Sequence, residues 1–267
     1  MKNLKIFDVR YMADGSENEK MPYYLKQQSI SQMSMLVKQV DDLNVLQLGL
    51  LNLQVFSNQT GIGVVDKLIP DRHPNNPNRE LKNLKAIVVH YTANPHPSAD
   101  AINNAKYFGR SYSVRDSKYV ESNGANFRFG SAQIIFDCNR GCRALPLDSI
   151  AWGSGDTPIQ PDGKPGQRPL AINILNGMSN SHSLHIEICN NNNWLQATKN
   201  AHVFIQWVVN SLHLNVLKNE SLNPQVFKDS LSPNEILVLR HHDVTGKICP
   251  KPFIDDPLAW QNFVMSI

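Results

Sequence analysis

The segment Glu235-Ile-Leu-Val-Leu-Arg-His-His-Asp-Val-Thr-Gly-Lys-Ile-Cys-Pro250 joins an apolar run to a group of metal-binding side chains. The apolar run, residues 235–240, predicts a short buried strand or the end of a helix. Two imidazoles, His241 and His242, follow it at once, and Cys249 adds a thiol a few residues later. Zinc prefers Cys sulfur and His nitrogen as ligands. The segment therefore predicts a rigid element that delivers an imidazole and a Gly- and Pro-containing loop that returns a thiol.

A third candidate ligand lies far upstream. Residues 86–89 are apolar and mostly β-branched, and they predict a buried strand that ends in His90. A catalytic zinc site needs three protein ligands and an open position for water, and the end of a strand would project His90 into such a site. A single histidine is more often structural than a ligand, so the prediction rests on the whole pattern.

Length and composition narrow the class of protein. With 267 residues, 41% of them hydrophobic and 18% charged, the chain suits a globular catalytic domain with a smaller appendage. The net charge of +3 is too small to argue for nucleic acid. No apolar run reaches about 18 residues, so no membrane span is expected. Four cysteines do not form a disulfide framework, and Cys138 and Cys142 are expected as free thiols or a late disulfide.

The first part of the chain differs from the rest. Residues 29–56 carry apolar side chains at roughly helical spacing without an interrupting proline, so they predict a helix. We expect a small, mainly helical N-terminal segment over residues 1–62 and a catalytic domain over residues 63–267. This helix, or a helical hairpin, could pack on the main domain, or the segment could serve in oligomerisation or in docking to a particle. A membrane-surface helix is disfavoured because its polar face lacks an excess of Lys and Arg.

Strands and helices alternate in the rest of the chain. Strands are predicted at residues 86–90, 133–137, 143–147 and 183–189, and helices at residues 99–108, capped by Ser98, and 194–214. Ser232-Pro-Asn-Glu235 has capping-box spacing and predicts a helix start. This order predicts an α/β fold with a mixed central β-sheet flanked by helices. Residues 148–181 predict a long loop, which is usually functional or mobile.

The strand at residues 183–189 carries a carboxylate. Alternation puts its aliphatic side chains on one face and His185, Glu187 and Cys189 on the other. A carboxylate among apolar neighbours is costly unless it is paired or functional. Glu187 is therefore a candidate catalytic residue, and a salt-bridged structural carboxylate is the alternative.

With these motifs in hand, the sequence resembles the zinc-dependent N-acetylmuramoyl-L-alanine amidases of bacteria and their phages, a family that includes the peptidoglycan-recognition proteins. The matching segments are residues 86–94, 131–137, 183–190 and 240–253, in the family's order. The most specific is His-Asp-Val-Thr-Gly-Lys-x-Cys-Pro, which begins at His242. The resemblance implies an α/β fold and hydrolysis of the amide bond between N-acetylmuramic acid and L-alanine in bacterial peptidoglycan.

The resemblance also implies roles for individual residues. His90, His241 and Cys249 would hold Zn2+, with His241 preferred to His242 because the family places this ligand eight residues before the cysteine. Glu187 would act as general base and acid. Lys247 would stabilise the oxyanion, and the alternative for it is a solvated loop lysine.

Three residues depart from the family's pattern. Ala132 stands where some members carry a catalytic tyrosine, so Glu187 would contribute more to catalysis. Gly153 follows Ala-Trp where relatives often have histidine, and this weakens any prediction about substrate contacts there. His185 stands where glycine is usual, and it could orient Glu187 or compete for zinc.

Two other interpretations stay open. A peptidoglycan-binding module without activity is disfavoured because non-catalytic relatives typically lose the cysteine ligand, whereas Cys249 is present. A structural zinc site would need four protein ligands and no water. The N-terminus lacks the apolar core of a signal peptide. We therefore expect synthesis in the cytoplasm and action on the cell wall after release, as a phage or prophage endolysin or as a lysin on a tail-like particle.

Overall fold

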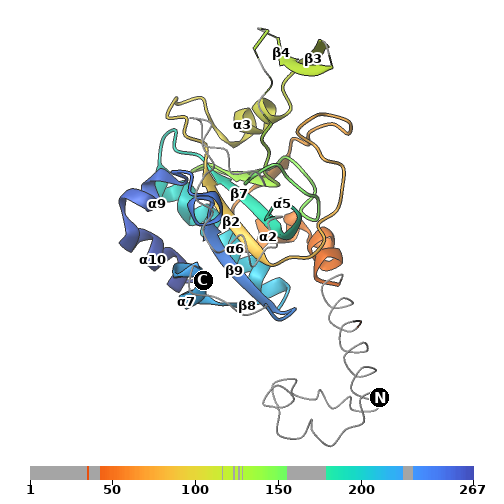
Figure 1. Cartoon of the computed structure of the whole chain (residues 1–267). Helices are drawn as coiled ribbons and strands as arrows, with labels where there is room; N and C mark the ends of the chain where they lie inside the picture. Colours follow the sequence, from red (N-terminus) through yellow and green to blue (C-terminus); the bar gives the residue numbers. More distant parts are fainter. Residues whose placement is uncertain are drawn as a thin grey trace, which may run out of the picture. The chain divides into compact units, whose positions relative to one another are not determined.

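The chain divides into two units, Met1–Val40 and Asp41–Ile267, and nearly all of the described residues belong to the second. The computed structural model describes residues 35, 43–115, 117–122, 124–125, 127, 129–154, 179–224 and 231–267 (Figure 1). Part of the helix predicted over residues 29–56 and most of the loop predicted over residues 148–181 lie outside the described residues.

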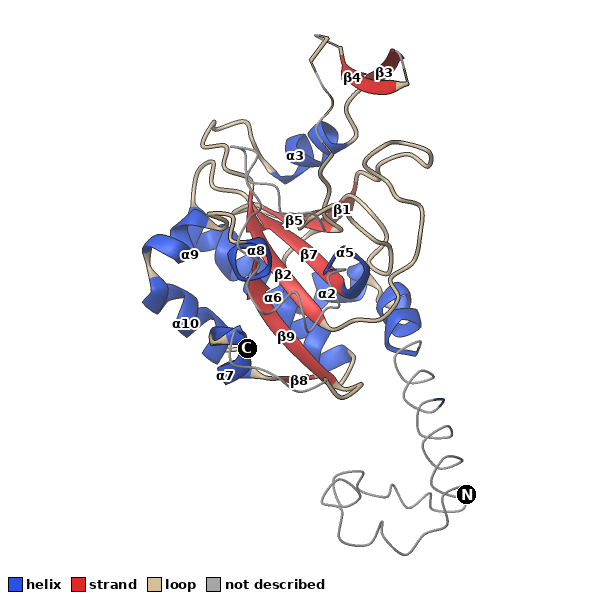
Figure 2. Ribbon diagram, in the orientation of Figure 1, coloured by secondary structure: helices blue, strands red, loops and turns tan. Residues whose placement is uncertain are grey.

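A seven-stranded mixed sheet in the order β1-β6-β5-β7-β2-β9-β8 forms the centre of the second unit (Figure 2). Its strands are β1 (Val64–Asp66), β2 (Ala86–Tyr91), β5 (Ile134–Phe136), β6 (Gly141–Arg143), β7 (Ser183–Ile188), β8 (Asn215–Val216) and β9 (Glu235–Arg240). The run from β5 to β8 is parallel, and β6 lies antiparallel to β5. A separate antiparallel pair consists of β3 (Tyr112–Arg115) and β4 (Lys118–Glu121). The predicted mixed sheet is confirmed.

Helices flank this sheet on both faces, as predicted. They are α2 (Leu53–Thr60), α3 (Ala101–Phe108), α5 (Ser179–His182), α6 (Trp194–Ser211), α7 (Lys218–Leu222), α8 (His241–Thr245), α9 (Lys251–Asp255) and α10 (Pro257–Met265). Ile134 and Phe136 of β5 pack in the cluster that contains α6, whereas Ile135 packs with α3. The two helices therefore cover opposite faces of β5. Among the described residues, no helix combines the length and the apolar character that a bilayer span requires.

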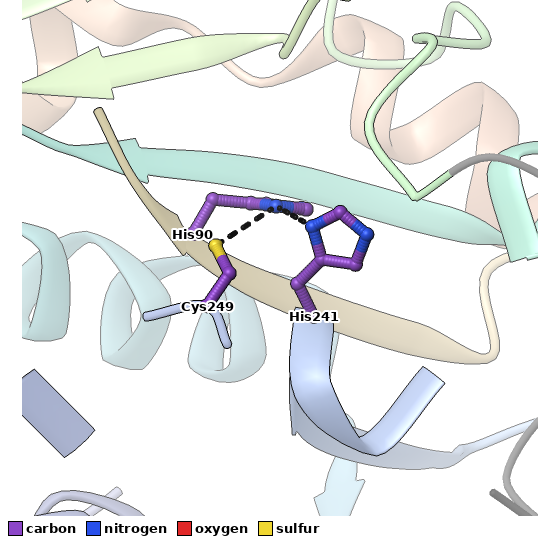
Figure 3. A group of neighbouring side chains, drawn as sticks. All are labelled: His90, His241 and Cys249. Atoms are coloured by element: carbon purple, nitrogen blue, oxygen red, sulfur yellow. Dashed lines mark hydrogen bonds between the residues drawn. The ribbon is translucent and has the colours of Figure 1, made fainter. Parts of the chain in front are cut away.

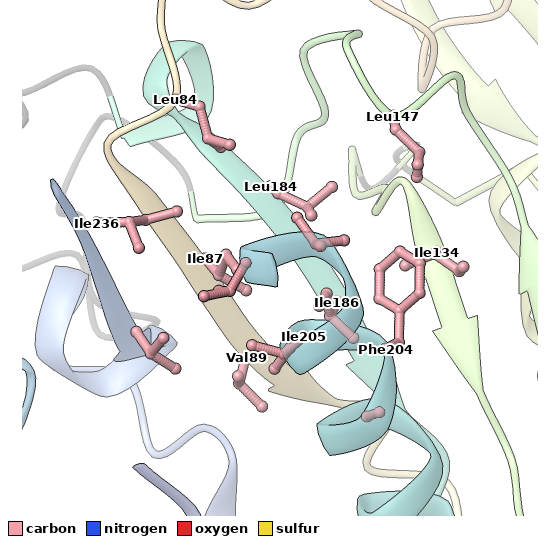
Figure 4. Close-up of a cluster of buried hydrophobic side chains, with 14 of the residues drawn as sticks. Leu84, Ile87, Val89, Ile134, Leu147, Leu184, Ile186, Phe204, Ile205 and Ile236 are labelled. Atoms are coloured by element: carbon pink, nitrogen blue, oxygen red, sulfur yellow. The ribbon is translucent and has the colours of Figure 1, made fainter. Parts of the chain in front are cut away.

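The main hydrophobic core lies between the sheet and α6 (Figure 4). It takes alternate residues from the central strands, namely Ile87 and Val89 of β2, Leu184, Ile186 and Ile188 of β7, and Ile236 and Val238 of β9. Burying each such side chain contributes about 1.5–3 kcal/mol. Because side chains alternate along a strand, this packing sends His90, His185 and Glu187 to the other face.

Residues 43–60 of the N-terminal segment contribute to this core. Residues 43–50 are helical, and they contribute Val45 and Leu48, while α2 contributes Leu53 and Phe56. Asn52 separates the two helices, because its side-chain oxygen accepts a hydrogen bond of 2.9 Å from the Gln54 N–H and caps α2. A single continuous helix over residues 43–56 is therefore wrong, whereas the mainly helical character of the segment is confirmed for residues 43–60. A docking or oligomerisation role for residues 1–62 stays a prediction.

Candidate active site

Three neighbouring parallel strands bring the candidate residues to one edge of the sheet. Strand β2 lies between β7 and β9, and its register pairs His90 with Glu187 and Val89 with Arg240. His241 follows Arg240 as the first residue of α8. The side chains of His90, Glu187 and His241 thus lie at the carboxyl ends of parallel strands, where α/β proteins bind ligands.

His90, His241 and Cys249 converge in the interior, and each is buried (Figure 3). His90 Nδ1 lies 3.0 Å from His241 Nδ1 and 3.9 Å from Cys249 Sγ. Tetrahedral zinc, with bonds of about 2.0–2.1 Å to nitrogen and about 2.3 Å to sulfur, holds two such ligand atoms about 3.3–3.6 Å apart. The observed separations lie on either side of this range, so the three side chains fit a zinc ion after small shifts.

The number of candidate ligands in this group indicates whether a zinc site here would be catalytic or structural. Within the described ranges, these three residues form a group whose ligand atoms all lie within 4.8 Å of one another, without a fourth His, Cys, Asp or Glu. Three protein ligands with an open position are typical of a catalytic zinc site, whereas a structural site has four. The group also lines a cavity of about 830 Å³.

Burial sets the protonation of the three side chains. It lowers the pKa of both His90 and His241 well below the ordinary value, and the charges of Lys247 and of the neighbouring imidazoles act in the same direction. Burial also raises the pKa of the Cys249 thiol to about 12. Neutral imidazoles are the form that binds metal, but the thiol must release its proton when a metal binds.

The loop that carries Cys249 is tied back to α8. Gly246 ends α8 with φ 80°, in the left-handed region that glycine adopts without strain. The His242 N–H donates to the Cys249 carbonyl at 2.8 Å, and His242 Nδ1 lies 3.1 Å from the Lys247 carbonyl oxygen. Of the two adjacent histidines, His241 therefore joins the group of candidate metal ligands, whereas His242 contacts the loop.

Glu187 and Lys247 both line the cavity beside this group. Glu187 is half-buried, and its Oε2 is buried without a hydrogen-bond partner among the described residues. Burial raises the pKa of Glu187 to about 7, although the charge of exposed Lys247 opposes the shift. A carboxyl with a pKa near 7 can both accept and donate a proton at neutral pH.

The rest of the described cavity wall is rich in amide and aromatic side chains. It includes Asn94, Asn103, Asn104, Tyr107, Phe129 and Trp152. Sequence analysis missed these residues, because no motif for metal binding or proton transfer marks them. Their place in the wall depends on how segments far apart in the chain come together.

His185 is the other notable side chain near the group. It is fully buried, and burial lowers its pKa to about 3. Its Nδ1 lies 3.0 Å from His90 Nε2. The structure thus places His185 against His90, a contact that neither of its two predicted roles includes.

The fold and the site together define a class of α/β protein with a buried His-His-Cys group at the carboxyl edge of a mixed sheet. The model of the N-acetylmuramoyl-L-alanine amidase family matches residues 80–252. The chain therefore belongs to this family.

Named relatives agree with this assignment. The N-acetylmuramoyl-L-alanine amidase CwlL of Bacillus licheniformis is 24% identical over 203 residues, which cover 76% of this chain and 46% of the relative. The N-acetylmuramoyl-L-alanine amidase BlyA of Bacillus subtilis (strain 168) is 25% identical over 195 residues, which cover 73% of this chain and 44% of the relative. The chain thus spans less than half the length of these relatives.

Solved structures show the same fold. The catalytic domain of XlyA is 23% identical, with a TM-score of 0.51, and the match covers 76% of this chain and 99% of that domain. A mutant endolysin from Bacillus subtilis is 24% identical with the same TM-score and the same coverage. At this level of identity the likeness concerns the fold alone.

Proposed function

We propose that the protein is a zinc-dependent N-acetylmuramoyl-L-alanine amidase, which hydrolyses the amide bond between N-acetylmuramic acid and L-alanine in bacterial peptidoglycan. One observation carries the proposal: the ligand atoms of His90, His241 and Cys249 lie within 4.8 Å of one another. Membership of the amidase family supports the choice of substrate.

His90, His241 and Cys249 would hold the metal ion. When bound, zinc supplies a Lewis acid for the amide carbonyl and makes water nucleophilic at neutral pH. The two neutral imidazoles are in the form that binds metal, and the Cys249 thiol, whose pKa burial raises to about 12, would release its proton when the metal binds.

Glu187 would move the protons of the reaction. Its carboxylate accepts a proton from the attacking water, and its carboxyl group then donates this proton to the leaving amine of L-alanine. Because the pKa of Glu187 is raised to about 7, both steps are accessible near neutral pH. Lys247, which lines the same cavity, would stabilise the negative charge that develops on the carbonyl oxygen.

We also propose that the protein acts at the bacterial cell wall, because its substrate lies there. It would be made in the cytoplasm and reach the wall after release, either as a phage or prophage endolysin or as a lysin carried on a tail-like particle. That a protein of the same fold is described as an endolysin is in keeping with the first route.

Digestion of purified peptidoglycan, with and without a chelator, tests the activity. The protein should release new N-terminal alanine from intact glycan strands, as mass analysis would show, and the chelator should stop the release. Glu187→Gln should keep its zinc and lose the activity, whereas Cys249→Ser should lose both. New reducing sugar ends would instead identify a glycosidase, and full activity in chelator would exclude the metal mechanism.

A further inference from the structure

His185 has no assigned role, although its ring lies directly against a proposed metal ligand. Its Nδ1 is 3.0 Å from His90 Nε2, while His90 Nδ1 faces His241 Nδ1 at the same distance. The two nitrogens of an imidazole point to different sides of the ring. His185 therefore contacts His90 from the side away from His241 and Cys249. It lies outside the group of three candidate ligands.

The positions of the ring protons follow from this arrangement. A nitrogen that binds a metal offers its lone pair, so a neutral His90 with Nδ1 toward the metal carries its proton on Nε2. This Nε2–H then donates to His185 Nδ1, which acts as the acceptor. If His185 Nδ1 donated instead, the proton of His90 would sit on Nδ1 and would block the lone pair that the metal needs.

The backbone and the packing hold the His185 ring in place. In the sheet, His185 is paired with Val88 of β2, and its N–H donates to Gln133 Oε1 at 2.8 Å. Gly153 leaves the space for the ring, because a Cβ at this position would lie 2.4 Å from His185 Cγ and Nδ1. The acceptor is thus fixed by a strand and by a close approach of the loop at Gly153.

We propose that His185 is a positioning residue for the metal site, which accepts a hydrogen bond from His90 Nε2 and so keeps His90 Nδ1 turned toward the metal. The inference rests on the proposed function in one respect, that His90, His241 and Cys249 are zinc ligands. Loss of such a partner of a ligating histidine typically weakens metal binding by about 10–100-fold.

A matched pair of substitutions tests the proposal. Asparagine places an oxygen acceptor close to the position of His185 Nδ1, whereas leucine has the same branched skeleton without an acceptor. Zinc affinity is measured by competition with a chromophoric chelator, after urea unfolding of the metal-free proteins has compared their stability. His185→Leu should weaken zinc binding by about 10–100-fold, and His185→Asn should stay within about threefold of wild type.

The outcomes separate this inference from the proposed function. If the wild-type protein binds no zinc, both the positioning role of His185 and the proposed function are wrong. If wild type binds zinc and cleaves peptidoglycan but His185→Leu binds zinc as tightly, the positioning role alone is wrong. Equal weakening in His185→Leu and His185→Asn would also overturn it, because packing and not the acceptor would then matter.

Two further measurements keep the test decisive if His185→Leu does not fold. Gly153→Ala leaves His185 in the chain but pushes its ring away, and it should weaken zinc binding as well. In the zinc-loaded wild type, imidazole nitrogen NMR should show a protonated Nε2 and a metal-bound Nδ1 at His90. Zinc on His90 Nε2, or unchanged zinc affinity in Gly153→Ala, would overturn the proposal.

Discussion

Replacing Glu187 by glutamine should stabilise the metal-free protein at pH 8 and stabilise it less at pH 5. Glu187 is half-buried, its Oε2 has no hydrogen-bond partner in the described part of the chain, and burial raises its pKa from 4.5 to about 7. Above pH 7 the folded protein must therefore keep a poorly solvated negative charge, which glutamine does not carry.

The sign and size of the effect follow from proton binding. In the unfolded chain the carboxyl ionises near pH 4.5, whereas in the folded protein it keeps its proton until about pH 7. Between these values the folded state binds more protons, so the contribution of Glu187 to stability falls as pH rises through this window. The full difference in pKa corresponds to about 3 kcal/mol. Because water in the cavity screens the charge, we expect about 1–2 kcal/mol.

Urea unfolding of the chelator-treated proteins at pH 5 and pH 8 measures the effect. All other ionisable groups are the same in the two proteins, so the difference between wild type and Glu187→Gln isolates the carboxyl. Exposed Glu80 provides the control, and Glu80→Gln should change stability little. A stability difference for Glu187→Gln that is the same at both pH values, or that favours wild type at pH 8, would refute the reasoning.

Cys249→Ser should lose stoichiometric zinc in metal analysis, and retained zinc would remove the thiol from the ligand set. Zinc binding to wild type should weaken as pH falls from 8 to 6, because the Cys249 thiol, with its raised pKa, must release a proton to bind; an affinity independent of pH in chelator competition would contradict this. Lys247→Met should lower kcat with zinc content unchanged, whereas unchanged kcat would make Lys247 a solvated loop residue. Phe204→Ala should lower the free energy of unfolding by about 3–5 kcal/mol in urea titrations, since the ring is fully buried, and a loss below about 1 kcal/mol would contradict its place in the core.

The central elements were predictable because their patterns are local. The β-branched run that ends in His90 became β2, and the alternating run with Glu187 became β7. The apolar stripe downstream became α6, which covers the core face of the sheet. In each case one face of the element is apolar, and the spacing of its apolar residues fixes the type of element.

Predictions that depended on a single signal were less successful. Ser232 and Glu235 have capping-box spacing, and the Ser232 N–H does donate to Glu235 Oε2 at 2.9 Å, yet the chain continues as strand β9 because it pairs with β2. Tertiary pairing outweighs this local preference. At α3 the cap is Asp100 in place of Ser98, since its side chain accepts the Asn103 N–H at 2.7 Å.

The candidate site shows where sequence reasoning stops. The types of its residues were visible, but the contact of His185 with His90 depends on the strand order, which pairs β7 with β2, and on Gly153 from a separate loop. None of the three positions is near another in the sequence. Single-sequence patterns do not carry such pairings, because strand order and register are properties of the whole sheet.

The spacing of neighbouring strands explains why two candidate ligands lie at the ends of adjacent strands. Neighbouring strands lie about 4.8 Å apart, a little more than the separation of about 3.3–3.6 Å that two zinc ligands need. Side chains from the adjacent ends of β2 and β9 could therefore reach one ion by leaning only slightly, and His90 Nδ1 lies 3.0 Å from His241 Nδ1. Strand β2 fixes His90, helix α8 fixes His241 directly after β9, and β7 carries both Glu187 and His185. Cys249 alone depends on a loop, so we expect changes in that loop to affect metal affinity before they affect the fold.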